Sequence, residues 1–348
     1  MKRIITSILV FILAFSLVAP LSVSAEKSGD FEYTVEDGKA TITGYVGKGG
    51  AVTIPSEIDG TPVTAIGAHA FEGQTSVTSL KIPNSVETVD YTALKGCDSI
   101  ESLDVDTETV TMAFSRLPSL KEVTIGEHVK KIDVSAFEVS PSLTTVTVKG
   151  PVTEIGSSAF EQCSSLKSFT MPDTVEKMGD SVFYKCTSLA SVKLSSSLKE
   201  IFDGNFVECT SLKEVEIPDS VTTIKDFAFY NCPALTTVYI PASVTKICEL
   251  AFGYTPSLKT VNYGGTEEDW EKITVEHGND GLDGATIEYN KRSGSEEKQI
   301  RNSEDVTRIV WAVVACLIVV AAIVTAILVW ISEKKKKEAK KAQRKTKR

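Results

Sequence analysis

The feature that most constrains this chain is an apolar side chain that returns at a fixed interval of 23 residues. Phenylalanine holds the position in six consecutive repeats: Phe137, Phe160, Phe183, Phe206, Phe229 and Phe252. The same column extends toward the N-terminus through Phe114, Leu94 and Phe71, with one interval shortened to 20 residues. A short fixed period is typical of a solenoid, in which each repeat buries its apolar face against its neighbours. We therefore predict about nine stacked turns, which favours display of a surface over catalysis.

One repeat changes its period internally, as the segment 156–175 shows. Apolar residues from Ala159 to Leu166 are mostly three positions apart, which predicts a short helical turn, whereas Phe169 and Met171 alternate as in a strand. Pro172 then closes the strand, because proline is confined to strand ends and edges. A second extended piece follows in each turn, as in 220–224. The pattern predicts a leucine-rich-repeat-like solenoid of short strands and short helical turns, mostly β with some α/β character.

The recurring motif is I-G-x-x-A-F-x-x-C-x-x-L-x-x-V-x-I-P-x-S-V. It is carried, among others, by Ile155-Gly156, Ala159-Phe160, Cys163, Ile217-Pro218 and Ser220-Val221. This motif resembles the BspA-like, Treponema-type leucine-rich-repeat family, and it recurs in register over about 52–261. The resemblance implies a curved solenoid exposed on a cell surface, with an adhesive role.

Both ends of the repeat region resemble caps, which solenoids need to cover their open ends. We expect an N-terminal β cap over 26–51, the solenoid over 52–262 and a C-terminal cap over 263–290. In the first cap, 31–33 and 40–45 alternate as paired strands joined by Asp37-Gly38. In the second, Thr266 is placed to cap a short helix that lays Trp270 and Ile273 over the last coil.

The flanking segments predict export and anchoring. Residues 1–25 have two basic residues, an apolar run and a small-residue cleavage site, as in a signal peptide. Residues 291–308 are polar and aperiodic, which indicates a stalk. The uncharged segment 309–331 would span about 35 Å as a helix, enough to cross a bilayer. The basic segment 332–348 is then expected to stay in the cytoplasm, so that the ectodomain is extracellular.

Charge restricts the partners of the exported segment. The whole chain carries −9, the signal segment contributes +2 and 332–348 contributes +8, which leaves −19 between them. An acidic ectodomain repels nucleic acid and bare anionic membrane, so that we expect cationic or neutral partners.

No cofactor, metal or catalytic site is predicted. The cysteine column of Cys97, Cys163, Cys186, Cys209 and Cys232 suits small buried side chains, because coils about 4.8 Å apart hold neighbouring Cβ atoms too far apart for a disulfide. The three histidines, His69, His128 and His277, are scattered, and no nucleophile and base are visible together. The acidic segment 279–283 could suggest calcium, but it lacks the spacing of an EF-hand loop and is interpreted as a capping loop.

Two polar columns are expected on the outer face of the longer strands. Strand alternation directs one column outward at Lys81, Asp104, Thr124, Thr147, Thr170, Lys193, Glu216, Tyr239 and Asn262. A second column runs beside it at Ser102, Glu122, Thr145, Ser168, Ser191, Glu214, Thr237 and Thr260. The first contains one aromatic residue, and aromatic and long side chains often dominate binding energy. We therefore predict a contact patch centred on Lys193, Glu216 and Tyr239.

These observations favour a non-enzymatic, single-pass cell-surface protein that binds an extracellular protein or glycan and resembles an adhesin. The alternative is a structural or signalling component of the cell envelope without an adhesive role. A hydrolase is disfavoured, since no catalytic constellation is present in the sequence.

Overall fold

The computed structural model describes residues 25–294. The chain divides into two compact units, 1–291 and 292–348, and nearly all described residues belong to the first. All but the last residue of the predicted signal peptide (1–25), most of the predicted stalk, the predicted membrane span and the basic segment lie outside the described residues. Within the described residues, no helix has the length and hydropathy needed to cross a membrane.

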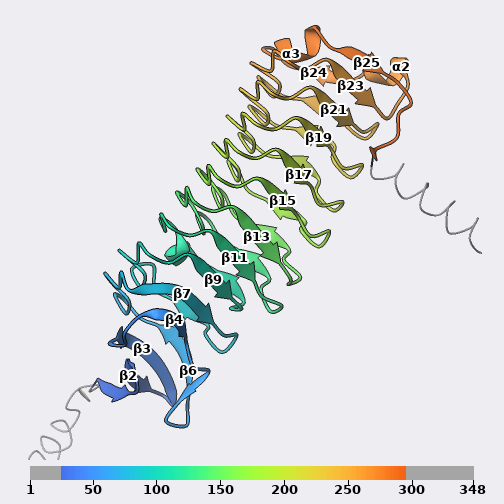
Figure 1. Cartoon of the computed structure of the whole chain (residues 1–348). Helices are drawn as coiled ribbons and strands as arrows, with labels where there is room; N and C mark the ends of the chain where they lie inside the picture. Colours follow the sequence, from blue (N-terminus) through green and yellow to red (C-terminus); the bar gives the residue numbers. More distant parts are fainter. Residues whose placement is uncertain (1–24, 295–348) are drawn as a thin grey trace, which may run out of the picture. The chain divides into compact units, whose positions relative to one another are not determined.

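Residues 25–291 form a solenoid whose coils each contribute a strand to two parallel rows (Figure 1). The first strand row consists of β4 (Gly50–Thr53), β7 (Val77–Ile82), β9 (Ser102–Val105), β11 (Glu122–Ile125), β13 (Thr145–Val148), β15 (Ser168–Thr170), β17 (Ser191–Lys193), β19 (Glu214–Glu216), β21 (Thr237–Ile240), β23 (Thr260–Tyr263) and β25 (Thr286–Glu288). It forms three hydrogen-bonded sheets, with breaks between β13 and β15 and between β17 and β19.

The second strand row follows the first after a short turn in each coil. It consists of β3 (Lys39–Tyr45), β6 (Thr61–Ile66), β8 (Thr88–Val89), β10 (Thr109–Val110), β12 (Lys131–Ile132), β14 (Glu154–Ile155), β16 (Lys177–Met178), β18 (Glu200–Ile201), β20 (Thr223–Ile224), β22 (Lys246–Ile247) and β24 (Thr274–Val275). Neighbouring strands that pair within this row are parallel, for example Lys131 with Glu154 and Thr223 with Lys246.

The number of turns is larger than the phenylalanine column indicates. Each row has 11 strands, so the nine turns predicted over 52–262 are continued at both ends. At the N-terminal end Ala40 in β3 pairs with Val63 in β6, and at the C-terminal end Ile287 in β25 pairs with Val261 in β23. These two end segments carry no phenylalanine of the column, because both lie in the predicted caps, and a search for the repeated ring therefore misses them.

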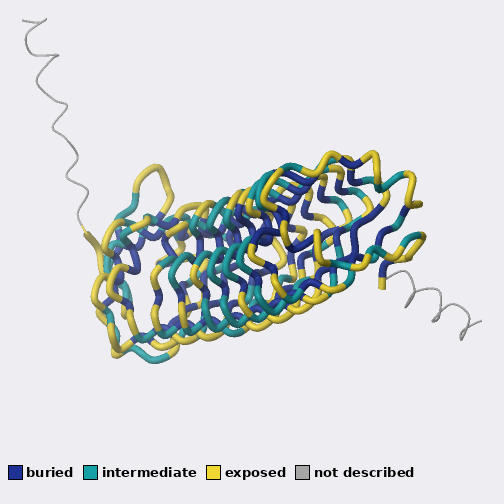
Figure 2. Tube along the Cα trace, turned by 90° about the horizontal axis from the view of Figure 1, so that it is seen from above, coloured by how far each residue is buried: buried dark blue, intermediate teal, exposed yellow. Residues whose placement is uncertain are grey.

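Buried residues recur in every coil along the solenoid (Figure 2, dark blue), and a stack of phenylalanine rings lies at the centre of this core. From Phe137 to Phe252, neighbouring rings of the column stack with centroids 5.1–5.7 Å apart and interplanar angles of 15° or less. Phe169, from a strand of the first row, fits between Phe160 and Phe183 at 5.1 Å from each. Stacked rings at this spacing join each coil to the next through buried apolar area and through ring geometry.

The segment from the second row back to the first, which we call the loop row, is made of turns. In the coil of Phe160, Ser158 and Gln162 have positive φ values of 57° and 58°. Bonds over three residues close these turns, from Ala159 N–H to Gly156 and from Cys163 N–H to Phe160. The predicted short helical turn is therefore wrong here, since a spacing of three fits both structures and the positive φ values break the helix.

A short 3-10 helix, η1 (Met112–Phe114), replaces the usual turn in the coil whose interval is 20 residues. Thr111 caps it by accepting a hydrogen bond from the Ala113 N–H. Compared with the next coil, two of the three missing residues are absent from the turn between β9 and β10 and one from the segment between β10 and Phe114, while β9 and β11 keep continuous pairing.

The N-terminal end is covered by β1 (Glu26–Ser28), β2 (Phe31–Glu36) and β3. Strands β2 and β3 pair antiparallel, and Asp37 and Gly38 between them have φ of 50° and 72°. Positive φ at both central residues is the geometry of a type I′ hairpin turn, so the expected hairpin is confirmed. A small excursion, β5 (Glu57–Ile58), pairs antiparallel with β6.

The C-terminal end contains α2 (Glu267–Trp270) and α3 (Asp280–Asp283). Thr266 and Asp269 form a reciprocal capping box at the start of α2, which confirms the expected cap. The Trp270 ring contacts Tyr263 edge to face at 5.1 Å, and Ile273 is buried. This arrangement covers the apolar end of the last coil.

Candidate binding surface

The two predicted polar columns lie on the first strand row in the expected register. Lys81 pairs with Asp104, Asp104 with Thr124 and Thr124 with Thr147. In the later sheets Thr170 pairs with Lys193, and Tyr239 pairs with both Glu216 and Asn262. Constant register follows from the constant period, since equal repeats place equivalent residues side by side in a parallel ladder.

Within the predicted patch, Lys193 lies across a sheet break from Glu216. The Lys193 ammonium is exposed and lies 3.2 Å from an oxygen of Asp173. A hydrogen bond from the Ser196 N–H, together with Lys193, holds the pKa of Asp173 below its ordinary value. An exposed pair of this kind contributes little to stability, so Lys193 can exchange Asp173 for a partner at low cost.

The Tyr239 side chain is not exposed as the sequence suggested. Only 8% of Tyr239 is accessible, and its hydroxyl donates to Asp219 at 3.1 Å. A Cβ at Gly264 would come 2.9 Å from the Tyr239 hydroxyl, so the side chain lies over the bare backbone of the next coil. Strand alternation predicts only the direction of the Tyr239 Cβ. Because Gly264 has no side chain, the Tyr239 ring has room to lie against the backbone of the next coil. The expectation of an outward-standing Tyr239 ring is therefore wrong.

The six cysteines among the described residues are free thiols, and all are buried. Five of them donate to the phenylalanine carbonyl of the preceding coil, at 2.9–3.3 Å: Cys97, Cys163, Cys186, Cys209 and Cys232. Burial raises the pKa of Cys163 and of Cys232 to about 12. A thiol that stays protonated is a poor nucleophile and a poor metal ligand, and this column therefore has a structural role.

The remaining cysteine lies in a group of possible metal ligands. The ligand atoms of Asp226, Cys248 and Glu276 all lie within 4.8 Å of one another. The Lys246 ammonium is 2.7 Å from Glu276 and holds the pKa of that carboxyl below its ordinary value. Partial burial raises the pKa of the Cys248 thiol. A lysine ion pair and a protonated thiol both oppose metal binding, so this group does not by itself make a metal site.

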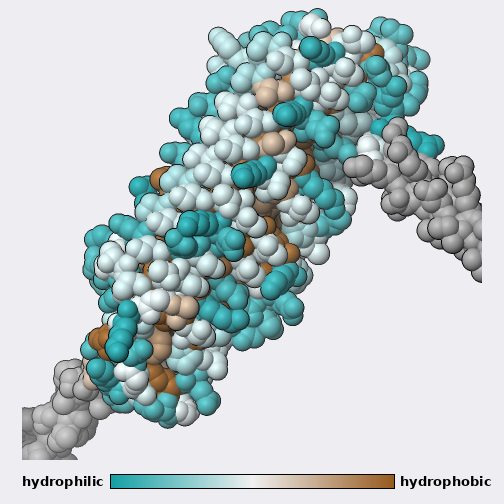
Figure 3. Space-filling view, in the orientation of Figure 1, coloured by the Kyte–Doolittle hydropathy of each residue, from teal (hydrophilic) through white to brown (hydrophobic). Residues whose placement is uncertain are grey.

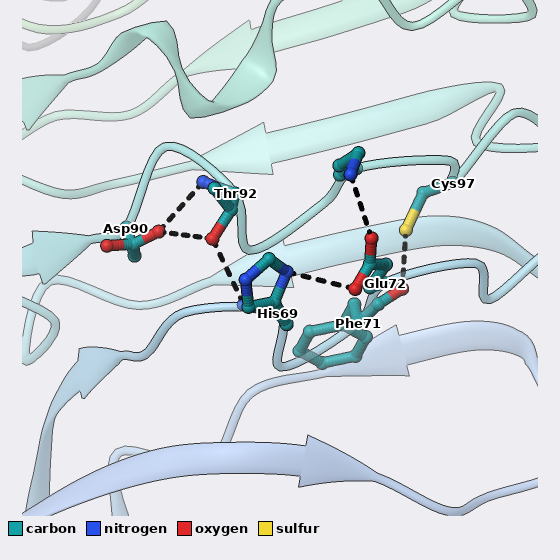
Figure 4. Close-up of polar contacts among 7 residues, drawn as sticks. His69, Phe71, Glu72, Asp90, Thr92 and Cys97 are labelled. Carbon is teal, nitrogen blue, oxygen red and sulfur yellow. Dashed lines mark hydrogen bonds and ion pairs between the residues drawn. The ribbon is translucent and has the colours of Figure 1, made fainter.

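The first two repeats place His69 close to a threonine and two carboxylates, without catalytic geometry (Figure 4). The His69 ring lies 2.9 Å from Glu72, and its backbone N–H donates to the Thr92 hydroxyl at 3.2 Å. The Thr92 hydroxyl donates in turn to Asp90, and the bonds from Thr92 lower the pKa of this carboxyl. The bond from His69 to the threonine hydroxyl therefore comes from the backbone, while the ring contacts Glu72.

The acidic segment 279–283 caps the loop row of the last coil. The Asn279 side chain accepts from the Phe252 N–H at 2.8 Å and donates to the carbonyls of Cys248 and Glu276. Asp280 accepts from the Tyr254 N–H at 3.2 Å. These contacts replace the backbone bonds that a further coil would make, as a cap requires.

The sequence reasoning missed an aromatic cluster on the loop row. Phe227 and Tyr254 are exposed. Earlier coils carry Ser181 and Gly204 at the position of Phe227, and Asn231 at the position of Tyr254. The available signal was a single aromatic residue in each of two columns that are otherwise mostly polar or glycine, which is visible once the repeats are aligned. On the face seen in Figure 3, hydrophobic surface is confined to scattered patches among polar residues.

Comparison with known proteins gives a family and a fold. Residues 51–167 and 153–273 match the model of the "BspA type Leucine rich repeat region", with six copies. A leucine-rich-repeat protein from Bacteroides ovatus is 22% identical over 76% of this chain and 68% of its own, with a TM-score of 0.52. A leucine-rich cell-surface protein from Faecalibacterium prausnitzii is 24% identical over 75% of this chain and 100% of its own, with a TM-score of 0.32. No curated protein matches.

Proposed function

The chain belongs to the BspA-type leucine-rich-repeat family, and on that premise we propose that it is a membrane-anchored cell-surface protein whose solenoid binds an extracellular protein or glycan. In this proposal residues 309–331 cross the membrane once, the N-terminal solenoid is extracellular and the basic segment is cytoplasmic.

The observation that carries the binding role is the in-register polar face of the first strand row. Equivalent residues pair side by side from Lys81 to Asn262, interrupted by two sheet breaks. Serine, threonine and acidic side chains dominate this face, so it offers hydroxyl and carboxylate groups at a regular spacing. A regular array of this kind suits an extended partner that contacts several coils at once.

Within this face, Lys193, Glu216 and Tyr239 remain our proposed centre of contact, with a changed role for Tyr239. Lys193 is exposed, and Glu216 is partly exposed. The buried Tyr239 ring supports the surface, and its hydroxyl orients Asp219, which is exposed. The partner would therefore contact Lys193, Glu216 and Asp219 directly, while Tyr239 acts as a positioning residue.

The full chain in detergent, applied to an array of glycans and extracellular proteins, tests the proposal. We expect a specific ligand whose affinity falls at least about fivefold in the double variant Lys193→Ala/Glu216→Ala, while Lys81→Ala, in the same column at the other end, serves as the matched control. Such exposed substitutions shift stability by under about 0.5 kcal/mol. A chain that binds nothing on the array contradicts the binding role, and an unchanged affinity of the double variant moves the site elsewhere.

A further inference from the structure

Three aromatic side chains on the loop row form a surface that does not belong to the core. Phe227 is 40% exposed and Tyr254 is 61% exposed, and Tyr230 lies between them. The rings of Phe227 and Tyr230 meet edge to face at 5.5 Å, and those of Tyr230 and Tyr254 at 5.2 Å. We call these three residues the aromatic platform. It joins two neighbouring coils into one continuous aromatic surface.

The local backbone is adapted to hold the platform. A Cβ at Gly253 would come 3.1 Å from the Tyr230 ring, so glycine leaves the ring room to lie on the backbone of the next coil. Phe227 and Tyr254 have φ of 56° and 55°, the same conformation that Ser181 and Asn231 adopt at these positions in other coils. The rings therefore stand on turns that fold equally well with small polar residues, and folding does not require aromatic side chains here.

A row of carboxylates runs directly beside the platform. Asp180, Asp203 and Asp226 occupy one position of three successive coils, and Asp226 immediately precedes Phe227 in the chain. Backbone bonds from Ser181 to Asp203 and from Gly204 to Asp226 hold these coils side by side. None of the three carboxylates takes part in an ion pair among residues 25–294. Partial burial and the two neighbouring carboxylates raise the pKa of Asp203, because the row brings three negative charges close together.

The basic groups near this surface are already engaged. Lys225 pairs with Glu200 at 3.3 Å, Lys246 with Glu276 at 2.7 Å and His277 with Glu249 at 2.7 Å. Farther along the same loop row, the Lys185 ammonium lies over the Tyr184 ring at 5.0 Å from its centroid. The chain itself thus shows that an aromatic ring on this row accepts a cation.

We propose that the aromatic platform and the adjacent row of Asp180, Asp203 and Asp226 bind an arginine-containing basic segment of a protein partner. Arginine satisfies both halves of the surface, because its planar guanidinium stacks on aromatic rings and its fork of N–H groups matches a carboxylate. A neutral sugar could stack on the rings but would leave the carboxylates uncompensated. The proposal rests on the binding function above and assigns it a second site, on the loop row, with a partner of defined charge.

The test measures affinity of the full chain in detergent for a labelled peptide of alternating arginine and glycine, at near-physiological salt. The matched probes are a lysine–glycine peptide, a serine–glycine peptide and a neutral oligosaccharide. We expect the arginine peptide to bind at least about threefold more tightly than the lysine peptide, since lysine cannot stack as a plane. The other two probes should bind more weakly still.

The test variant is Phe227→Ser/Tyr254→Asn, which copies residues that other coils carry at the same φ. We expect it to weaken arginine-peptide binding about tenfold, equivalent to about 1.4 kcal/mol, and Asp203→Asn to weaken it at least about twofold. The control is Tyr91→Ser, which removes a tyrosine that is 69% exposed in an N-terminal coil and should leave binding unchanged.

Arginine-peptide binding that falls less than about threefold in the double variant overturns the proposal, as does tighter binding of the oligosaccharide than of the arginine peptide. If the double variant melts at a lower temperature than the parent chain, the single variants Asp203→Asn and Phe227→Ser replace it as the test of arginine-peptide binding. The peptide measurement is independent of the array. A chain without any array partner contradicts the proposed function, whereas an array partner that contacts only the first strand row leaves that function intact.

Discussion

At the scale of single residues, the phenylalanine and cysteine columns are coupled through the same backbone groups. Each ring stacks on the next, and five cysteines donate to the carbonyl of the phenylalanine in the preceding coil. The column is interrupted at Ser140, whose hydroxyl is fully buried and has no hydrogen-bond partner. A buried hydroxyl without a partner is a local cost to stability.

Ser140→Cys should therefore stabilise the chain. Sulfur is larger and less costly to bury than a hydroxyl, and the other coils show that it reaches the preceding carbonyl. We expect the free energy of unfolding to rise by about 1 kcal/mol, measured by urea denaturation. Ser142→Cys, at a partly exposed position of the same turn, is the control. A destabilised Ser140→Cys variant would contradict this description of the column.

The buried thiols also predict a loss of stability at alkaline pH. Burial raises the pKa of Cys163 from 9.0 to about 12. Between these values the unfolded chain loses a proton that the folded chain keeps, so the free energy of unfolding falls as pH rises. It is unaffected by this thiol below about pH 9. Each such thiol contributes a slope of up to about 1.4 kcal/mol per pH unit.

Comparing Cys163→Ala with the parent chain in urea at pH 8 to 11 isolates this effect, because lysines and tyrosines titrate in both proteins. The parent should lose stability more steeply than the variant above pH 9. Parallel curves would mean that the Cys163 thiol is accessible to solvent.

At the scale of elements, the caps depend on local side-chain bonds. Thr266 accepts from the Asp269 N–H at 3.2 Å and holds the start of α2. Thr266→Ala should destabilise the C-terminal coil by about 1 kcal/mol, whereas Thr266→Ser should cost much less. Hydrogen exchange of the amides in 260–275 measures this directly. Equal exchange rates in all three proteins would show that α2 is held by Trp270 packing alone.

The repeat made much of the strand architecture predictable. A constant period fixes the parallel register, so the outward columns follow from alternation, and Asp37-Gly38 and Thr266 are local signals of a hairpin and a helix start. The loop row was mispredicted because its spacing fits turns and helices alike, and positive φ at Ser158 and Gln162 leaves no mark in the sequence. Tyr239 was mispredicted because its burial depends on Gly264, in the next coil.

At the scale of the whole molecule, the solenoid offers two different surfaces. The first strand row presents hydroxyl and carboxylate groups in a regular array, and the loop row carries the aromatic platform beside the row of Asp180, Asp203 and Asp226. The terminal coils, which the phenylalanine column does not reveal, extend both rows and merge them with the caps. A long partner could contact one row through several coils, and the two rows could serve different partners.

The central claim is that the solenoid is displayed outside the cell and binds there. The most direct measurement is partner binding to intact cells that express the chain with one tag after residue 26 and another at the C-terminus, before and after external protease. The account predicts that protease removes the solenoid and the binding together and leaves the C-terminal tag protected, because the basic segment 332–348 resists translocation. Loss of the C-terminal tag, or binding that survives removal of the solenoid, would contradict it.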